Sequence, residues 1–264
     1  MQKKPTGEVD RTMDDTDKFV LQIEGLKKSF GKYNVLTDVS YSLPKGEIAA
    51  IIGPNGAGKT TFFNLITGYH LVDGGTIRFM GREITNWPRH RIARKGISRA
   101  FQVSNIYPRL TTFENVRQAI LSQQKRTLNI FTPAHRLARK NTLDLLELTG
   151  LLSHKDTLAG ILSQGDKKKL ELALALAGKP ELLLLDEPTA GMSSEETHET
   201  MQLVKRLNRE IGLSILFTEH DISVIFGYAR KLSVLYQGMV IAEGTPEEVR
   251  KNEEAQKCYL GEEV

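Results

Sequence analysis

The segment GPNGAGKTT, residues 53–61, restricts most strongly what this 264-residue chain can fold into. It fits the pattern G-x-x-x-x-G-K-[ST] and lies between a predicted strand and a predicted helix, the context that a phosphate-binding loop requires. Backbone N–H groups and the helix N-terminus are expected to hold nucleotide phosphates, with Lys59 adding positive charge and Thr60 binding Mg²⁺. The predicted nucleotide-binding residues of the loop are Gly53, Pro54, Asn55, Gly56, Ala57, Gly58, Lys59, Thr60 and Thr61.

A second motif ends a predicted buried strand. Residues 181–187, ELLLLDE, form a continuous apolar run that is typical of a central strand covered on both faces. A carboxylate at the end of such a strand is costly unless it meets a cation, so Asp186 is predicted to help hold Mg²⁺. Glu187 is predicted to orient and deprotonate the attacking water. An Asp-Glu pair alone is often a solvated turn, but the phosphate-binding loop favours catalysis.

The remaining pattern predicts an α/β core with a helical insertion. Strand patterns occupy residues 19–26 and 74–81, a mostly helical stretch covers about 103–178, and strands and helices alternate again from residue 181. Thr111 with Glu114, and Thr245 with Glu248, are predicted capping boxes. Residues 1–18 are expected to form a polar, flexible tail ahead of one folding unit at 19–264, with neither a signal peptide nor a membrane span.

Two further polar residues lie near the ends of predicted strands. Gln102, in SRAFQ, follows a short apolar segment where the core passes into the helical insertion, and could touch both Mg²⁺ and the attacking water. His220 ends ILFTEH and could contact the γ-phosphate as a neutral imidazole. Taken alone, a surface glutamine and a structural histidine are the ordinary interpretations.

Composition excludes several classes of protein. The chain is 40% hydrophobic and 26% charged, as in soluble globular proteins, and its single Cys258 excludes an internal disulfide framework. The net charge of +4 permits contact with nucleic acid without requiring it. The basic runs at 89–95 and 167–169 are ordinarily solvated helix faces.

Together these motifs resemble the ATP-binding-cassette (ABC) ATPases over residues 19–264. The resemblance implies an α/β fold made of an ABC-type P-loop nucleotide-binding domain with an inserted helical subdomain and an N-terminal antiparallel β-subdomain, which hydrolyses ATP with Mg²⁺. Gln102 matches the family's Q-loop, both a catalytic residue and a metal ligand, while His220 matches the switch histidine and Glu187 the catalytic carboxylate. In KKSFGKYNVL, Phe30 matches best the aromatic that stacks on adenine, with Tyr33 as the alternative.

The turn LSQGD, residues 162–166, is similar to the family signature Leu-Ser-Gly-Gly-Gln. By this resemblance, Ser163 and Gly165 bind the ATP of a facing subunit, which implies a dimer with a second ABC ATPase, identical or homologous. Two segments depart from the family pattern, at three positions in all. The signature has Gln164 and Asp166 in place of glycine and glutamine, and Ser193 stands where the D-loop usually has aspartate.

Finer features are similar to the ATP-binding subunit of importers for branched-chain amino acids or related amides. They include RHRIARKGISRAFQ, DEPTAGM, FTEHD, VIAEGTPEEVR and YLGEE. This resemblance implies attachment to transmembrane permease subunits at the cytoplasmic face of the inner membrane, with a solute-binding protein as an indirect partner and no nucleic acid. The alternatives are the ATPase of a lipopolysaccharide-export system, a soluble ABC ATPase acting on DNA or ribosomes, and a binding protein with inactive catalytic parts.

Overall fold

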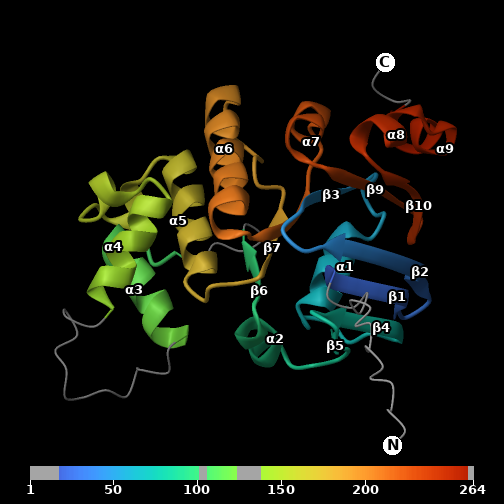
Figure 1. Cartoon of the computed structure of the whole chain (residues 1–264), viewed down its shortest axis with the longest axis horizontal. Helices are drawn as coiled ribbons and strands as arrows, with labels where there is room; N and C mark the ends of the chain where they lie inside the picture. Colours follow the sequence, from blue (N-terminus) through green and yellow to red (C-terminus); the bar gives the residue numbers. More distant parts are fainter. Residues whose placement is uncertain (1–17, 101–105, 124–137, 261–264) are drawn as a thin grey trace, which may run out of the picture.

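The computed structural model describes residues 18–100, 106–123 and 138–260, and ten strands within these ranges form one sheet (Figure 1). Their order is β5-β4-β1-β2-β10-β9-β3-β8-β7-β6. The strands are β1 (Phe19–Phe30), β2 (Tyr33–Pro44), β3 (Ile48–Ile52), β4 (Gly74–Phe79), β5 (Arg82–Glu83), β6 (Ile97–Ala100), β7 (Leu182–Asp186), β8 (Ser214–Thr218), β9 (Lys231–Tyr236) and β10 (Met239–Gly244). The α/β architecture expected from the sequence is confirmed.

The sheet has a parallel part and an antiparallel part. Strands β9, β3, β8, β7 and β6 run parallel to one another, and β3 and β8 are buried along their whole length. Strands β1, β2, β4 and β5 pair antiparallel and form the predicted N-terminal β-subdomain. Strand β10 joins the two parts, because it pairs antiparallel with β9 and parallel with β2 between Met239 and Asp38.

Helices cover both faces of the parallel strands (Figure 1). Alternate side chains of β7 divide between two apolar cores: Leu182 and Leu184 pack in the core that contains Phe62 of α1, whereas Leu183 and Leu185 pack toward α5 and α6. The helices are α1 (Lys59–Ile66), α2 (Arg89–Lys95), α3 (Thr112–Gln123), α4 (Arg139–Leu148), α5 (Gln164–Leu176), α6 (Ser194–Ile211), α7 (Ile222–Tyr228), α8 (Pro246–Lys251) and α9 (Glu253–Ala255), with 3₁₀ turns at Leu152–His154 and Ala159–Ile161 and a π turn at Gln256–Leu260.

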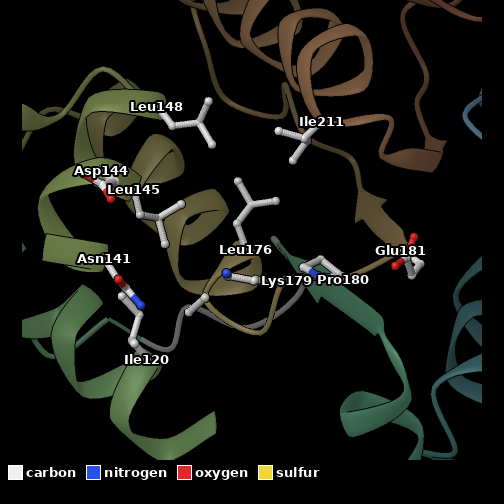
Figure 2. Close-up of a pocket in the computed structure, with 11 residues that line it drawn as sticks. Ile120, Asn141, Asp144, Leu145, Leu148, Leu176, Lys179, Pro180, Glu181 and Ile211 are labelled. Atoms are coloured by element: carbon white, nitrogen blue, oxygen red, sulfur yellow. The ribbon is translucent and has the colours of Figure 1, made fainter. Parts of the chain in front are cut away.

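Helices α3, α4 and α5 form a lobe beside the sheet (Figure 1). The lobe has its own apolar core, which includes Val116, Leu146 and Leu170. Figure 2 shows a hollow of about 480 Å³ between this lobe and the main body, where Leu145 and Leu148 of α4 face Ile211 at the end of α6. The helical insertion is therefore packed as a unit that touches the core over only part of its surface.

Most helix ends follow the predicted chemistry. The Thr111 N–H donates to Glu114 at 2.9 Å while the Glu114 N–H donates to the Thr111 hydroxyl at 3.1 Å, and Thr245 makes the equivalent capping box with Glu248. One end differs from expectation. Helix α5 ends at Leu176, and the left-handed conformation that often follows a helix falls on Lys179, with φ of 50°, rather than on Gly178.

No helix in the described ranges has both the length and the apolarity that crossing a bilayer would need.

Replacing Leu184 with alanine should lower the free energy of unfolding by about 2–5 kcal/mol. Leu184 is fully buried on β7, which pairs with β6 on one side and β8 on the other, so its removal leaves a cavity that the surrounding strands cannot readily fill. Urea denaturation followed by circular dichroism measures the change. Leu71→Ala is the matched control, because Leu71 is 63% exposed and its truncation should change stability by less than about 0.5 kcal/mol. Equal losses in the two variants would contradict the assignment of the core.

Candidate nucleotide-binding and catalytic site

The loop between β3 and α1 takes a shape that glycine permits. Gly53 and Gly58 have φ of 156° and 106°, and a Cβ on Gly53 would lie 2.0 Å from the carbonyl oxygen of Leu235. Gly58 is the N-cap of α1 and supplies no side-chain cap, and the first turn contains no acidic residue. Within the described part of the chain, no side-chain acceptor caps the N-terminal N–H groups of α1, so they suit an anion. Thr60 and Thr61 follow in the first turn, with Thr60 exposed.

Lys59 lies at the bottom of this loop. Its side chain is buried, and its ammonium donates to the carbonyl oxygens of Gly53 at 2.6 Å and Pro54 at 3.2 Å. Burial lowers the pKa of Lys59, while the charges of Glu187 and Asp186 oppose that shift. Two of the three ammonium protons are donated to carbonyl oxygens, so one remains for a ligand. Burial disfavours the charged ammonium, and the negative charge of a bound phosphate would stabilise it.

Asp186 ends β7 and is held on both carboxylate oxygens. Arg99 on β6 donates to Oδ2 at 2.6 Å, and the Thr218 hydroxyl on β8 donates to Oδ1 at 2.8 Å. Arg99 also donates to Oδ1 of Asn64 on α1 at 2.6 Å, which connects the carboxylate to the helix of the phosphate-binding loop. Each carboxylate oxygen keeps a lone pair, so Asp186 fits a role beside Mg²⁺, through the ion or its water. Within the described ranges, no cluster of three or more His, Cys, Asp or Glu forms a metal site without phosphate.

Glu187 and His220 meet although they follow different strands, β7 and β8. Nε2 of His220 lies 3.1 Å from Oε1 of Glu187, and both side chains are nearly half exposed. Glu187 has φ of 50°, a left-handed conformation that costs about 1–2 kcal/mol for a residue with a Cβ. Its N–H donates to the carbonyl oxygen and the hydroxyl of Thr218, at 3.1 and 3.2 Å, and these bonds hold the conformation. The pair forms an accessible polar site next to Asp186.

Four side chains of this site were missed by the sequence reasoning: Asn64, Arg99, Thr218 and Glu219. Their contacts join separate strands and α1, so no local spacing reveals them. Three of them nevertheless lie in segments that the sequence analysis had already identified. Arg99 belongs to SRAFQ, and Thr218 and Glu219 belong to FTEHD. Gln102 lies outside the described residues, and its predicted role stays a prediction.

The signature turn begins α5. Ser163 is the N-cap, and its hydroxyl accepts from the Asp166 N–H at 3.1 Å and donates to Oδ2 of Asp166 at 2.9 Å. The carboxylate of Glu196 on α6 lies against Gly165 and belongs to the capping box of Ser193. The Ser163 hydroxyl is therefore engaged in hydrogen bonds with Asp166, and Ser193 is the N-cap of α6. Figure 1 shows α5 well apart from α1, so this turn does not belong to the phosphate-binding loop of its own chain.

The two candidate adenine-stacking aromatics are both accessible. Phe30 ends β1, is 41% exposed and packs edge-on against His70 with ring centroids 5.1 Å apart. Tyr33 begins β2 and is 80% exposed. Phe30 is thus the more firmly held of the two, and its role in stacking on adenine stays a prediction.

A groove of about 450 Å³ runs beside β6, the edge strand of the sheet. It is bounded by Arg99 and its neighbours on β6, by α3 and by α5. Two buried polar atoms in it, Nε of Arg99 and Oε2 of Glu171, have no hydrogen-bond partner within the described protein. One is a donor and the other an acceptor, so the groove suits a partly polar ligand or segment.

Comparison with known proteins identifies the family. The family model described as ABC transporter matches residues 36–190, and the model described as branched-chain amino acid ATP-binding cassette transporter matches residues 239–264. The high-affinity branched-chain amino acid transport ATP-binding protein LivG of Salmonella typhimurium is 40% identical over 250 residues, which cover 92% of this chain and 98% of LivG. The lipopolysaccharide export system ATP-binding protein LptB of Haemophilus influenzae is 35% identical over 243 residues, which cover 92% of this chain and 98% of LptB.

Solved structures agree. The ADP conformation of MJ1267, an ATP-binding cassette of an ABC transporter, superposes with a TM-score of 0.82 at 31% identity and covers 92% of this chain and 99% of MJ1267. A dimeric structure of MJ0796, a bacterial ABC transporter cassette, gives a TM-score of 0.72 at 26% identity and covers 86% of this chain and 98% of MJ0796. The chain belongs to the ABC transporter family and is one of its ATP-binding, ATP-hydrolysing cassettes.

Proposed function

We propose that this chain is the ATPase subunit of an importer for branched-chain amino acids or related amides. The observation that carries the solute class is the match of residues 239–264 to the branched-chain family model, supported by 40% identity to LivG. No comparable feature favours the export system over the importer, and the identity to LptB is lower. The cassette would lie at the cytoplasmic face of the inner membrane, attached through permease subunits.

The residues of the site have complementary roles in this proposal. Glycine N–H groups of residues 53–61 and Lys59 hold the ATP phosphates, and Phe30 stacks on adenine. Bound Mg²⁺, held by Thr60, Gln102 and Asp186, would neutralise phosphate charge. Glu187 accepts a proton from the attacking water, and His220, whose Nε2 lies 3.1 Å from Glu187, contacts the γ-phosphate as a neutral imidazole. Preorganised charge then supplies most of the rate, as is usual in phosphoryl transfer.

The working unit in this proposal is a dimer with a second cassette. The chain has one phosphate-binding loop, and its signature turn lies apart from that loop, so Ser163 and Gly165 would act on ATP held by the partner. Within the chain the Ser163 hydroxyl donates to Asp166, and the Glu196 carboxylate lies against Gly165. A partner's γ-phosphate would have to replace these carboxylates, which would make closure depend on a fully charged triphosphate.

The groove beside β6 is the proposed docking site for a cytoplasmic helix of the permease. The groove runs along the strand that leads to Gln102, so a segment seated there would lie beside the nucleotide site. The unpaired Nε of Arg99 and Oε2 of Glu171 would receive partners from such a segment. Closing of the cassette dimer around ATP would move the helical lobe, and the docked helix would carry that movement into the membrane.

Gentle affinity purification of the chain from detergent-solubilised membranes tests the assignment. Two permease subunits and a second cassette should accompany it, and an Ala119→Trp variant, which fills the groove, should recover at least tenfold less permease. Gln202→Trp is the control, because Gln202 is exposed on α6 away from the groove. Recovery of lipopolysaccharide-export components would replace the importer by the exporter. Recovery of the chain alone, or with nucleic acid, would contradict transport altogether.

A further inference from the structure

Glu219 is a buried carboxylate next to the catalytic pair. It follows β8 directly, stands between Thr218 and His220, and is 4% exposed. Within the described ranges it makes no ion pair. A charge buried in this way needs hydrogen-bond donors, and the identity of those donors indicates what the residue holds in place.

Within the described residues, the donors to Glu219 come from the segments that follow β7 and β8. The Thr189 N–H donates to Oε1 at 2.9 Å, and the Thr189 hydroxyl donates to the same oxygen. The N–H of His220 donates to Oε2 at 3.0 Å. One carboxylate therefore ties the segment that carries Glu187 to the residue that Glu187 contacts.

The tie matters because Glu187 is held from both sides. On one side Thr218 binds its N–H, and two residues later Glu219 binds Thr189. Between these two anchors Glu187 adopts a left-handed conformation that only its surroundings can maintain. Loss of the second anchor would let the Glu187 and His220 side chains drift apart while leaving the phosphate-binding loop in place, because the hydrogen bonds of Glu219 within the described residues go to Thr189 and His220.

We propose that Glu219 is a positioning residue for ATP hydrolysis: it holds Glu187 and His220 at the separation needed for turnover and takes no part in nucleotide binding. This inference rests on the roles proposed above for Glu187 and His220. It assigns a function to the glutamate that precedes the switch histidine in FTEHD.

The test is Glu219→Gln in the full chain. Glutamine has nearly the same shape, but its NH₂ group must face an N–H donor of either Thr189 or His220, so one tie is lost. The expected result is a fall in kcat for ATP of at least tenfold, with KM and the dissociation constant for a fluorescent ATP analogue within twofold of wild type. A misplaced catalytic pair slows the reaction, while the intact loop binds ATP as before.

The matched structural control is Asn208→Asp. Asn208 is also a buried polar residue, and its amide donates to the carbonyl oxygens of Gly46 and Leu213, ahead of β3 and β8 and so at the opposite ends of the strands. This variant should lower the melting temperature and leave kcat per folded molecule within twofold of wild type. If Glu219→Gln reduced activity only in proportion to its folded fraction, the role would be structural and the proposal would fail.

Coupling to Thr189 supplies a second readout. Thr189→Val should reduce kcat because it removes the hydroxyl donor, Thr189→Ser should restore it, and adding Glu219→Gln to Thr189→Val should produce much less than the product of the two effects. Independent effects would overturn the proposed tie. If Glu219→Gln kept wild-type kcat while Glu187→Gln was inactive, only this inference would fail. Full activity of Glu187→Gln would instead remove the proposed catalytic assignment.

Discussion

Glu187→Gln should reduce the ATPase rate of the cassette by roughly 100- to 10,000-fold, the usual contribution of a general base. The amide keeps the size of the side chain and a polar atom facing His220, but it cannot accept a proton from water. ATP affinity should remain within about threefold, because Glu187 lies outside the phosphate-binding loop. A phosphate-release assay and equilibrium binding of ATP measure the two quantities.

The same variant should accumulate as a closed dimer in ATP, since hydrolysis is the step that reopens it in the proposed cycle. Size-exclusion chromatography with light scattering, with and without ATP, measures this shift; if the natural assembly is a heterodimer, the second cassette must be present. Glu147→Gln on the exposed face of α4 is the matched control and should behave like wild type. Normal turnover by Glu187→Gln would remove Glu187 from the catalytic role.

Lys59→Met should weaken ATP binding by about 10- to 100-fold, because charge-assisted hydrogen bonds contribute about 1.5–3 kcal/mol. Methionine keeps most of the aliphatic stem and removes the buried ammonium. The rise in melting temperature that ATP confers on the wild type should nearly disappear in the variant. Isothermal titration calorimetry and thermal unfolding at fixed ATP concentration provide the two measurements.

Without nucleotide, Lys59→Met should unfold near the wild-type temperature. Burial lowers the pKa of Lys59, so the charged amine is unfavourable in the empty site, and its removal offsets the loss of its bonds to Gly53 and Pro54. Lys205→Met, at an exposed position on α6, is the control and should retain ATP affinity. A large loss of stability in the nucleotide-free variant would show that Lys59 serves mainly to hold the loop together.

The elements that the sequence predicted well are those defined by short-range chemistry. The glycines of residues 53–58 determine the loop shape, the apolar run of β7 determines a central strand, and Thr111 and Thr245 begin helices through residues three positions away. Each of these features depends on neighbours within a few residues. The periodicity and spacing of the sequence are therefore enough to predict these features.

The contacts that complete the site could not be predicted, because they depend on strand order. Arg99 reaches Asp186 across 87 positions only because β6 pairs with β7, and Glu219 reaches Thr189 only because β7 pairs with β8. The departures at Asp166 and Ser193 were visible in the sequence, yet their local partners required coordinates. Only the structure places Asp166 on the Ser163 hydroxyl and Ser193 at the cap of α6.

The helical lobe buries its apolar side chains largely among α3, α4 and α5. Substitutions within this core can therefore accumulate without disturbing the packing of the parallel sheet. A substitution at Val116 or Leu170 can be compensated by another within the lobe, without altering the strand ends that carry Asp186 and Glu187. In the docking proposed above, side chains along the groove can then change to suit a different permease helix. Such an arrangement allows the same ATP-hydrolysing site to work with different transporters, because the residues that perform hydrolysis need not change when the lobe does.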